Sequence, residues 1–231
     1  MGRRATAVLI SGSGTNLQAL LDAARAPDYP AAIRLVVSNR PDAFGLERAR
    51  RAKVPAVVVD HRAFAAREDF EAAIEEELRL AEVELVCLAG FMRILSAEFC
   101  ARWRDRVLNI HPSLLPAYRG LRTHERALSD GVAVSGCTVH FVRPELDAGP
   151  VLVQGVVPVL PDDDAERLRR RVLEVEHRCY PLALALLASG RVRVEGERVL
   201  VENEWPGERL VVHPLLARLA ANSPSFGTEP G

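Results

Sequence analysis

An asparagine and a histidine two residues apart carry the clearest chemical signal in this sequence. Asn109 and His111 lie in the run Leu-Asn-Ile-His-Pro-Ser-Leu-Leu-Pro, where they alternate with Leu108 and Ile110. Alternate side chains of a β-strand point to the same face, so the amide and the imidazole would lie side by side. An amide N–H can stabilise a carbonyl oxygen as negative charge develops on it, and an imidazole can move protons near neutral pH. The pair indicates acyl-type transfer, with a purely structural histidine as the alternative.

Asp147 lies further along, in the turn-like run Glu-Leu-Asp-Ala-Gly-Pro. An aspartate before Ala-Gly is commonly a hydrogen-bonding turn residue. If this turn folds back beside His111, the carboxylate would favour the protonated imidazolium. The functional interpretation of Asp147 therefore depends on that tertiary contact.

A glycine-rich loop near the amino terminus has the composition of a phosphate cradle. The run Ser-Gly-Ser-Gly-Thr-Asn-Leu, residues 11–17, follows a short apolar stretch and opens a helical pattern. Glycines allow close backbone approach, and a helix N-terminus supplies free N–H groups and positive dipole. The run lacks the Gly-Lys-Ser/Thr of a P-loop, and Leu17 replaces the third glycine of a dinucleotide fingerprint. The next strand ends in Ser38-Asn39-Arg40, without the acid that a nicotinamide cofactor's ribose would need. Anion binding is the prediction, and a simple capped turn is the alternative.

The elements that must position these residues alternate between strand and helix patterns. Strands are predicted over residues 5–10, 33–37, 56–59, 85–89, 107–110, 134–142 and 151–160, and helices over 16–26, 44–52, 64–80, 96–103 and 164–188. Asp163 or Asp164 would cap the last helix, and a hairpin is predicted over 191–201. Such alternation predicts an α/β fold: a Rossmann-like, doubly wound, mostly parallel sheet flanked by helices. Residues 1–203 would form one domain, and residues 204–231 a partly disordered extension.

Composition excludes several classes of protein. The 231 residues are 48% hydrophobic with a net charge of −1, so the basic footprint of a nucleic-acid-binding protein is missing. The four cysteines are widely spaced and indicate reduced thiols in a cytosolic protein. No signal peptide, membrane-spanning run or metal-ligand spacing is recognisable. We therefore expect a cytoplasmic protein with no metal and no nucleic-acid or membrane partner, whose oligomeric state the sequence leaves open.

Five runs in this order resemble one known family. They are Ser-Gly-Ser-Gly-Thr-Asn-Leu-Gln-Ala-Leu, Asp-Ala-Phe-Gly-Leu-Glu-Arg-Ala, Leu-Ala-Gly-Phe-Met-Arg-Ile-Leu, Asn-Ile-His-Pro-Ser-Leu-Leu-Pro and Glu-Leu-Asp-Ala-Gly-Pro. Over about residues 5–200 the chain is similar to phosphoribosylglycinamide formyltransferases that depend on 10-formyltetrahydrofolate. The resemblance implies formyl transfer from 10-formyltetrahydrofolate to the glycine amine of glycinamide ribonucleotide, in purine biosynthesis.

The resemblance also implies roles for individual residues. The catalytic trio would be Asn109, His111 and Asp147. The substrate's phosphate and ribose would be held by Ser13, Gly14, Thr15, Asn16 and Glu176, although Glu176 alone would read as a solvated helix carboxylate. The folate would contact Arg67, Met92, Arg93, Ile94, Leu95, Asn109, Val142 and Leu146.

Three other functions compete with this one. A methionyl-tRNA formyltransferase would share the chemistry and resembles this chain at Tyr118-Arg119-Gly120, but should show a basic surface and a further nucleic-acid-binding domain. A formyltetrahydrofolate hydrolase would carry a regulatory domain before the catalytic one, whereas here the catalytic pattern is expected from residue 5. A nucleotide-binding regulatory module of Rossmann type would need the missing ribose acid. The glycinamide ribonucleotide reaction is the function that the sequence favours.

Overall fold

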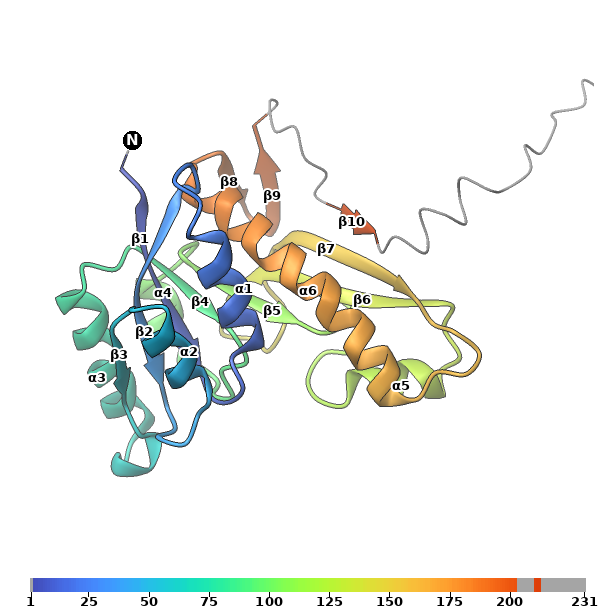
Figure 1. Ribbon diagram of the computed structural model, residues 1–231, viewed down its shortest axis with the longest axis horizontal. Coiled ribbons are helices and arrows are strands. Elements are labelled where there is room, and N and C mark those ends of the chain that lie inside the picture. Colours follow the sequence, from blue (N-terminus) through green and yellow to red (C-terminus); the bar gives the residue numbers. More distant parts are fainter. Residues whose placement is uncertain (1, 203–209, 213–231) are drawn as a thin grey trace, which may run out of the picture.

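Eight strands form one continuous sheet through the middle of the molecule (Figure 1). The computed structural model describes residues 2–202 and 210–212. The order across the sheet is β10-β7-β6-β5-β4-β1-β2-β3. The strand bounds are β1 (Arg4–Ile10), β2 (Ala31–Ser38), β3 (Ala56–Val58), β4 (Leu85–Leu88), β5 (Val107–His111), β6 (Val134–Phe141), β7 (Val151–Pro158) and β10 (Leu210–Val212).

The sheet is mostly parallel, with one reversed strand. All neighbours from β5 through β4, β1 and β2 to β3 pair in parallel, as do β7 and β10. Strand β6 runs antiparallel to both β5 and β7. In the β5–β6 register Asn109 lies opposite His140, and His111 lies opposite Thr138. Because directly opposed residues share a face, this register decides which side chain meets Asn109.

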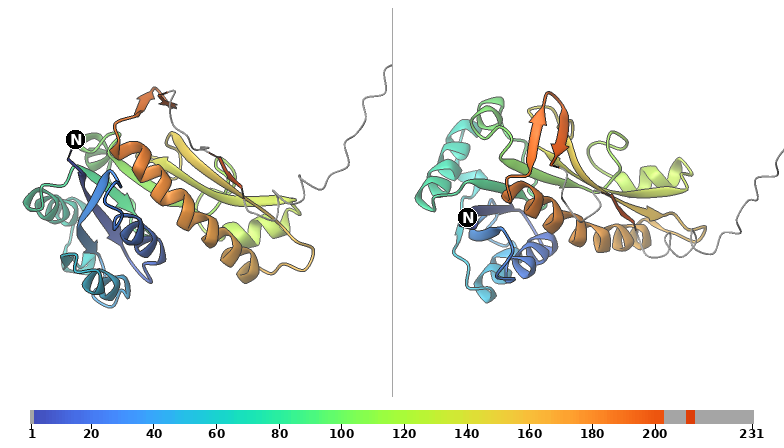
Figure 2. Two further views of the ribbon diagram at one scale, coloured as in Figure 1. Left: turned by 45° about the horizontal axis from the view of Figure 1, so that its top comes forward. Right: turned by 90° about the horizontal axis from the view of Figure 1, so that it is seen from above.

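Helices cover both faces of the sheet, as Figure 2 shows. Their bounds are α1 (Thr15–Ala23), α2 (Gly45–Arg51), α3 (Arg67–Leu80), α4 (Ala97–Arg102), α5 (Thr123–Ser129) and α6 (Ala165–Ala188), with a 3₁₀ turn at His61–Ala63. Val8 and Ile10 of β1 belong to the core that α1, α2 and α6 cover. Ala7 and Leu9 alternate with them and belong to the core that α3 and α4 cover. This alternation on a strand buried on both sides is the sign of a parallel sheet between two helical layers.

The predicted doubly wound α/β fold is confirmed. The hairpin expected over 191–201 is β8 (Val192–Glu195) paired with β9 (Arg198–Val201). Helix α5 was not predicted, because the residues that it buries include Thr123 and His124 and so break the apolar period. Strand β10 was also missed, since three residues are too few to show a pattern. Apart from this strand, the extension predicted over 204–231 lies outside the described residues.

No helix of the described ranges is long and apolar enough to cross a membrane. The longest, α6, carries charged side chains along its first half and runs diagonally over the sheet (Figure 1). Its apolar stripe is buried against β6 and β7. The helix therefore belongs to the water-facing layer of an α/β fold.

Two neighbouring aspartates fix the start of α6 in different ways. The Asp164 side chain accepts a hydrogen bond from the Arg167 backbone N–H at 2.7 Å and is the N-cap. The Asp163 side chain accepts from the Leu160 N–H at 2.8 Å and pairs with Arg171 at 2.6 Å. Asp164 is thus the cap, and Asp163 ties the preceding turn to the helix.

We expect Asp164→Ala to lower the free energy of unfolding by about 1 kcal/mol, because the first turn of α6 loses the acceptor for one of its free N–H groups. Chemical denaturation measures the change. The control is Asp162→Ala, whose exposed carboxylate pairs with Arg167 at 2.9 Å. Its loss should be clearly smaller than that of Asp164→Ala, because an exposed ion pair contributes little to stability. Equal losses in the two variants would contradict the capping role.

Candidate active site at the carboxyl ends of the strands

The carboxyl end of β5 carries Asn109 and His111 on one face, as the alternation in the sequence predicted. A buried tyrosine of α6 fixes this end of the sheet. The Tyr180 hydroxyl lies 2.9 Å from the Leu88 carbonyl oxygen and 3.0 Å from that of Leu108, so it can donate to either. The ends of β4 and β5 are therefore held together directly beside the two polar side chains.

His111 lies between two hydrogen-bond acceptors. Its Nδ1 is 3.3 Å from Asp147 Oδ2, and both side chains are only 8% exposed. Its Nε2 donates to the Tyr118 carbonyl oxygen at 2.9 Å. A neutral imidazole has one N–H, whereas an imidazolium has two. Both ring nitrogens of His111 face an oxygen acceptor.

Asp147 reaches this position because the turn after β6 folds back over β5. Its backbone has a φ of 50°, in the left-handed region that aspartate tolerates better than most residues. The same Oδ2 also accepts from the Gly120 N–H at 2.9 Å. The tertiary contact on which the functional interpretation of Asp147 depended is therefore made.

His140 orients Asn109, and sequence reasoning assigned it no role. Asn109 Nδ2 donates to His140 Nε2 at 3.1 Å, while His140 Nδ1 donates to the Phe141 carbonyl oxygen at 3.0 Å. Burial lowers the pKa of His140, which keeps the ring neutral and Nε2 free to accept. Its Nε2 is 3.8 Å from Asp147 Oδ1, but in this tautomer it has no proton to donate there. The β5–β6 register was the signal that would have revealed this partner, and a single sequence does not give it.

The glycine-rich loop joins β1 to α1 and lines a cavity of about 380 Å³. Gly14 is the N-cap of α1 with a φ of 68°. A Cβ at this position would lie 2.7 Å from the Gly45 Cα, so the approach of α2 as well as the backbone angle requires glycine. The N-terminus of α1 opens into this cavity next to the backbone and hydroxyl groups of the loop, an arrangement that suits an anion.

Glu176 connects α6 to this loop. Asn16 Nδ2 donates to Glu176 Oε2 at 2.7 Å. Burial raises the pKa of Glu176, and the hydrogen bond from Asn16 opposes that shift. Asn16 Oδ1 is buried and has no hydrogen-bond partner among the described residues. The structure thus brings Glu176 together with the loop, and the view of it as a solvated helix carboxylate is wrong.

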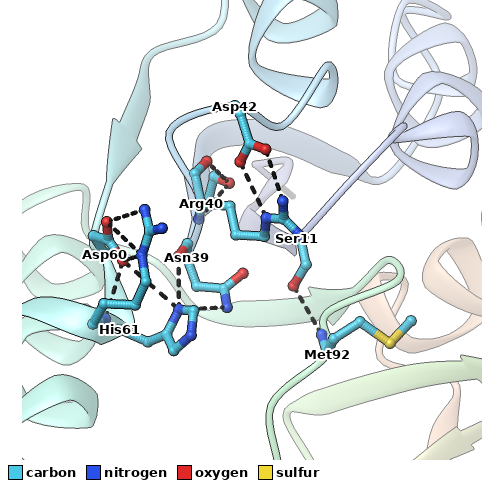
Figure 3. A network of polar contacts seen from close by, with 9 residues as sticks. Ser11, Asn39, Arg40, Asp42, Asp60, His61 and Met92 are labelled. Carbon is cyan, nitrogen blue, oxygen red and sulfur yellow. Dashed lines mark hydrogen bonds and ion pairs between the residues drawn. The ribbon is translucent and has the colours of Figure 1, made fainter.

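The far wall of the cavity comes from the ends of β2 and β3. Asn39 Nδ2 lies 3.2 Å from His61 Nδ1, and the same ring nitrogen is 3.0 Å from the Asn39 carbonyl oxygen (Figure 3). Arg40, which pairs with Asp42 at 2.7 Å, completes this wall. In the sequence, this stretch stood out only because Ser38-Asn39-Arg40 lacks the acid that a nicotinamide cofactor's ribose would need.

The residues expected to contact folate differ in their surroundings. Leu95 is buried, whereas Met92, Ile94 and Leu146 are exposed apolar side chains. The Met92 N–H donates to Ser11 Oγ at 2.8 Å, so this segment touches the glycine-rich loop. Arg93 lines the cavity, and Val142 is half-buried in the α3–α4 core.

Arg67 stands apart from this group. It opens α3, and its ion pair among the described residues is with Glu68 at 3.8 Å. The structure shows no contact that brings its guanidinium to the other candidate residues. Across residues 2–202 and 210–212, no group of three or more histidine, cysteine, aspartate or glutamate side chains is placed to hold a metal ion.

The buried, neutral His140 should make the free energy of unfolding fall as the pH is lowered. Because burial lowers its folded-state pKa below the ordinary 6.5, the unfolded chain takes up a proton first as the pH drops. The free energy of unfolding should then fall by up to about 1.4 kcal/mol per pH unit for each such histidine. Burial lowers the pKa of His124 and His177 in the same way.

His140→Gln removes one of these protons and keeps an acceptor for Asn109, so the loss of stability between about pH 6.5 and about pH 5 should become shallower. Urea denaturation at several pH values measures the slope. Identical slopes in the two proteins would show that His140 titrates normally.

Comparison with known proteins places this geometry in a family. Residues 4–184 match the formyl transferase family model. A trifunctional purine biosynthetic protein, adenosine-3, of Drosophila melanogaster is 50% identical over 197 residues, which are 84% of this chain but only 15% of that protein's length. The phosphoribosylglycinamide formyltransferase of Haemophilus influenzae is 44% identical over 82% of this chain and 89% of its own. A crystal structure of glycinamide ribonucleotide transformylase 1 from Symbiobacterium toebii superposes with a TM-score of 0.85 and 51% identity, covering 87% of this chain and 95% of that one. The chain belongs to the formyl transferase family.

Proposed function

We propose that this protein transfers the formyl group of 10-formyltetrahydrofolate to the glycine amine of glycinamide ribonucleotide. The products are formylglycinamide ribonucleotide and tetrahydrofolate, and the reaction serves purine biosynthesis in the cytoplasm. The observation that carries the proposal is the position of His111 between the Asp147 carboxylate and a backbone carbonyl, with Asn109 beside it on β5. The names of the relatives support the choice of substrates.

The proposed chemistry needs one new bond and one broken bond. The folate supplies the formyl carbon, to which the amine nitrogen bonds as the bond from that carbon to folate N10 breaks. The amine loses one proton and N10 gains one. Asn109, whose Nδ2 carries a second proton, donates to the formyl oxygen as negative charge develops on it, and protonated His111 adds positive charge beside it. Asp147 orients His111 and accepts the amine proton, directly or through water.

Two features of the chain support the choice of a small phosphorylated acceptor. The 11–16 loop offers backbone N–H groups and hydroxyls at the N-terminus of α1, within the cavity of about 380 Å³. Asn16 Oδ1 is a buried acceptor without a partner among the described residues, and Glu176 lies next to it. We assign the phosphate to Ser13, Gly14, Thr15 and Asn16, and a ribose hydroxyl to Glu176.

The exposed apolar residues fit the folate. Met92, Ile94 and Leu146 present hydrocarbon surface near the chemistry, which suits the flat faces of a pterin ring. Backbone groups of residues 92–95, including Arg93, would read the ring's polar edge, Val142 would complete the apolar wall, and Arg67 would attract the glutamate carboxylates. The assignment of Arg67 rests on the family resemblance alone.

A direct assay tests the function. The protein is incubated with 10-formyltetrahydrofolate and glycinamide ribonucleotide, without ATP and with a chelator. Formylated ribonucleotide and tetrahydrofolate in equal amounts are the expected products. Free formate in place of formylated ribonucleotide would indicate the hydrolase, and formylation of methionyl-tRNA alone would indicate the tRNA enzyme. Loss of activity on chelation, restored by a metal, would contradict the prediction of a metal-free reaction.

His111→Ala should lower kcat by about 100-fold or more, because a positioned acid or base typically contributes that much.

Asn109→Ala should lower kcat to a similar extent, and Asn109→Asp should be at least as harmful, since it places negative charge where the oxyanion forms. Steady-state kinetics with both substrates measure these effects. Near-normal turnover of His111→Ala, or faster turnover of Asn109→Asp than of Asn109→Ala, would overturn the assigned roles.

Gly14→Val should raise the KM for glycinamide ribonucleotide by at least about 10-fold, equivalent to about 1.4 kcal/mol. The reason is the left-handed φ of 68° together with the 2.7 Å approach of a Cβ to Gly45. Folate affinity should change little. The matched control is Gly190→Val, at a φ of 74° with open space around it. Equal weakening of both ligands in folded Gly14→Val, or a loss confined to folate, would contradict the phosphate assignment.

A further inference from the structure

Ser11 physically joins the two ligand-binding segments. It follows the last residue of β1 and is only 6% exposed. Its Oγ accepts a hydrogen bond from the Met92 backbone N–H at 2.8 Å, across the carboxyl ends of the neighbouring strands β1 and β4 (Figure 3). One hydroxyl therefore belongs to the glycine-rich loop and also holds the first residue of the 92–95 segment.

Among the described residues, no acceptor takes the proton of the Ser11 hydroxyl. A serine hydroxyl can accept and donate at the same time. At Ser11 the acceptor role is taken by Met92, and both residues line the cavity of about 380 Å³. The Ser11 proton is thus available to an anion in that cavity. Donating it would polarise Oγ and strengthen the hydrogen bond from Met92, because linked hydrogen bonds reinforce one another.

The 92–95 segment is anchored at both ends and exposed between them. At its far end, Ser96 donates its backbone N–H to Glu71 Oε1 at 2.6 Å and its hydroxyl to the other oxygen of the same carboxylate. Glu71 is 2% exposed and lies on α3, away from the glycine-rich loop. Met92, by contrast, is 68% exposed. Of the two anchors, only Ser11 also faces the cavity.

We propose that Ser11 is a positioning residue that couples the two substrates: a phosphate in the glycine-rich loop tightens the hold on Met92 and so favours the folate. The coupling rests on the proposed function for the identity of the ligands. It is reciprocal, because any factor by which one ligand changes the affinity of the other must apply in both directions.

The test is a binding cycle without turnover. Tetrahydrofolate and ribose 5-phosphate are titrated by calorimetry into the protein, each alone and each in the presence of the other at saturation. In the unaltered protein each ligand should tighten the other by the same factor, about 5-fold or more. In Ser11→Ala each ligand should still bind, and the factor should fall to about 1, because the link between the ligands is gone.

Two control variants separate coupling from general damage. Glu71→Gln disturbs the far anchor, so it should weaken tetrahydrofolate binding while the coupling factor stays unchanged. Ser38→Ala removes a buried hydroxyl at the end of the neighbouring strand β2, where it accepts from the Arg40 N–H at 3.2 Å. This variant should leave the coupling factor as it is in the unaltered protein.

The outcomes that overturn the inference differ from those that overturn the function. Independent binding of the two ligands to the unaltered protein, or full coupling in Ser11→Ala, excludes the role of Ser11 while formyl transfer stands. A coupling factor lost equally in Glu71→Gln would show that any disturbance of the segment suffices, which also excludes it. Failure of the folded, unaltered protein to bind tetrahydrofolate at all would overturn the proposed function and the coupling together.

Discussion

A carboxylate buried at the end of a β-strand must be surrounded by donors, and at Asp147 these donors come from separate parts of the chain. His111 is the last residue of β5, and Gly120 belongs to the loop that follows it. The Gly120 N–H donates to Asp147 Oδ2 in the turn after β6, and His111 Nδ1 lies 3.3 Å from the same oxygen. Since a buried charge without partners would be costly, these segments cannot separate independently. The arrangement of the loops above the sheet follows from this one requirement.

The turn after the reversed strand β6 has to fold back for this requirement to be met. Because β6 is antiparallel to β5, its carboxyl end at Phe141 lies opposite Leu108, and the turn that follows has to return along β5 to bring Asp147 to His111. The antiparallel register also sets His140 opposite Asn109, where burial keeps the imidazole neutral and able to accept. The two histidines beside Asp147 therefore have different tasks, because both nitrogens of His140 are engaged by Asn109 and the Phe141 carbonyl oxygen, whereas His111 has its closest contacts with Asp147 and the Tyr118 carbonyl oxygen.

Much of this architecture could be predicted from the sequence, and the reasons are local. Alternation at 108–111, the glycines of the 11–16 loop and the order of strands and helices are short-range patterns. What escaped prediction depends on distant partners. Glu176 becomes a buried neighbour of the loop only because α6 crosses α1, and α5 buries polar residues that no apolar period reveals. His140 acquires its role from a register, and Ser11 from a hydrogen bond to the neighbouring strand end.

The turn between β6 and β7 has a consequence for how the chain can change in length during evolution. His140 is fixed by pairing with β5, and Asp147 by its contact with His111, so the stretch between them spans a set distance. An insertion within β6 would also rotate the following side chains to the other face of the sheet. The segment between β7 and α6, in contrast, is tied through Asp163 to the start of the helix that it leads into, so its fixed points are local to that turn. Related chains should therefore gain and lose residues before α6 far more freely than between His140 and Asp147.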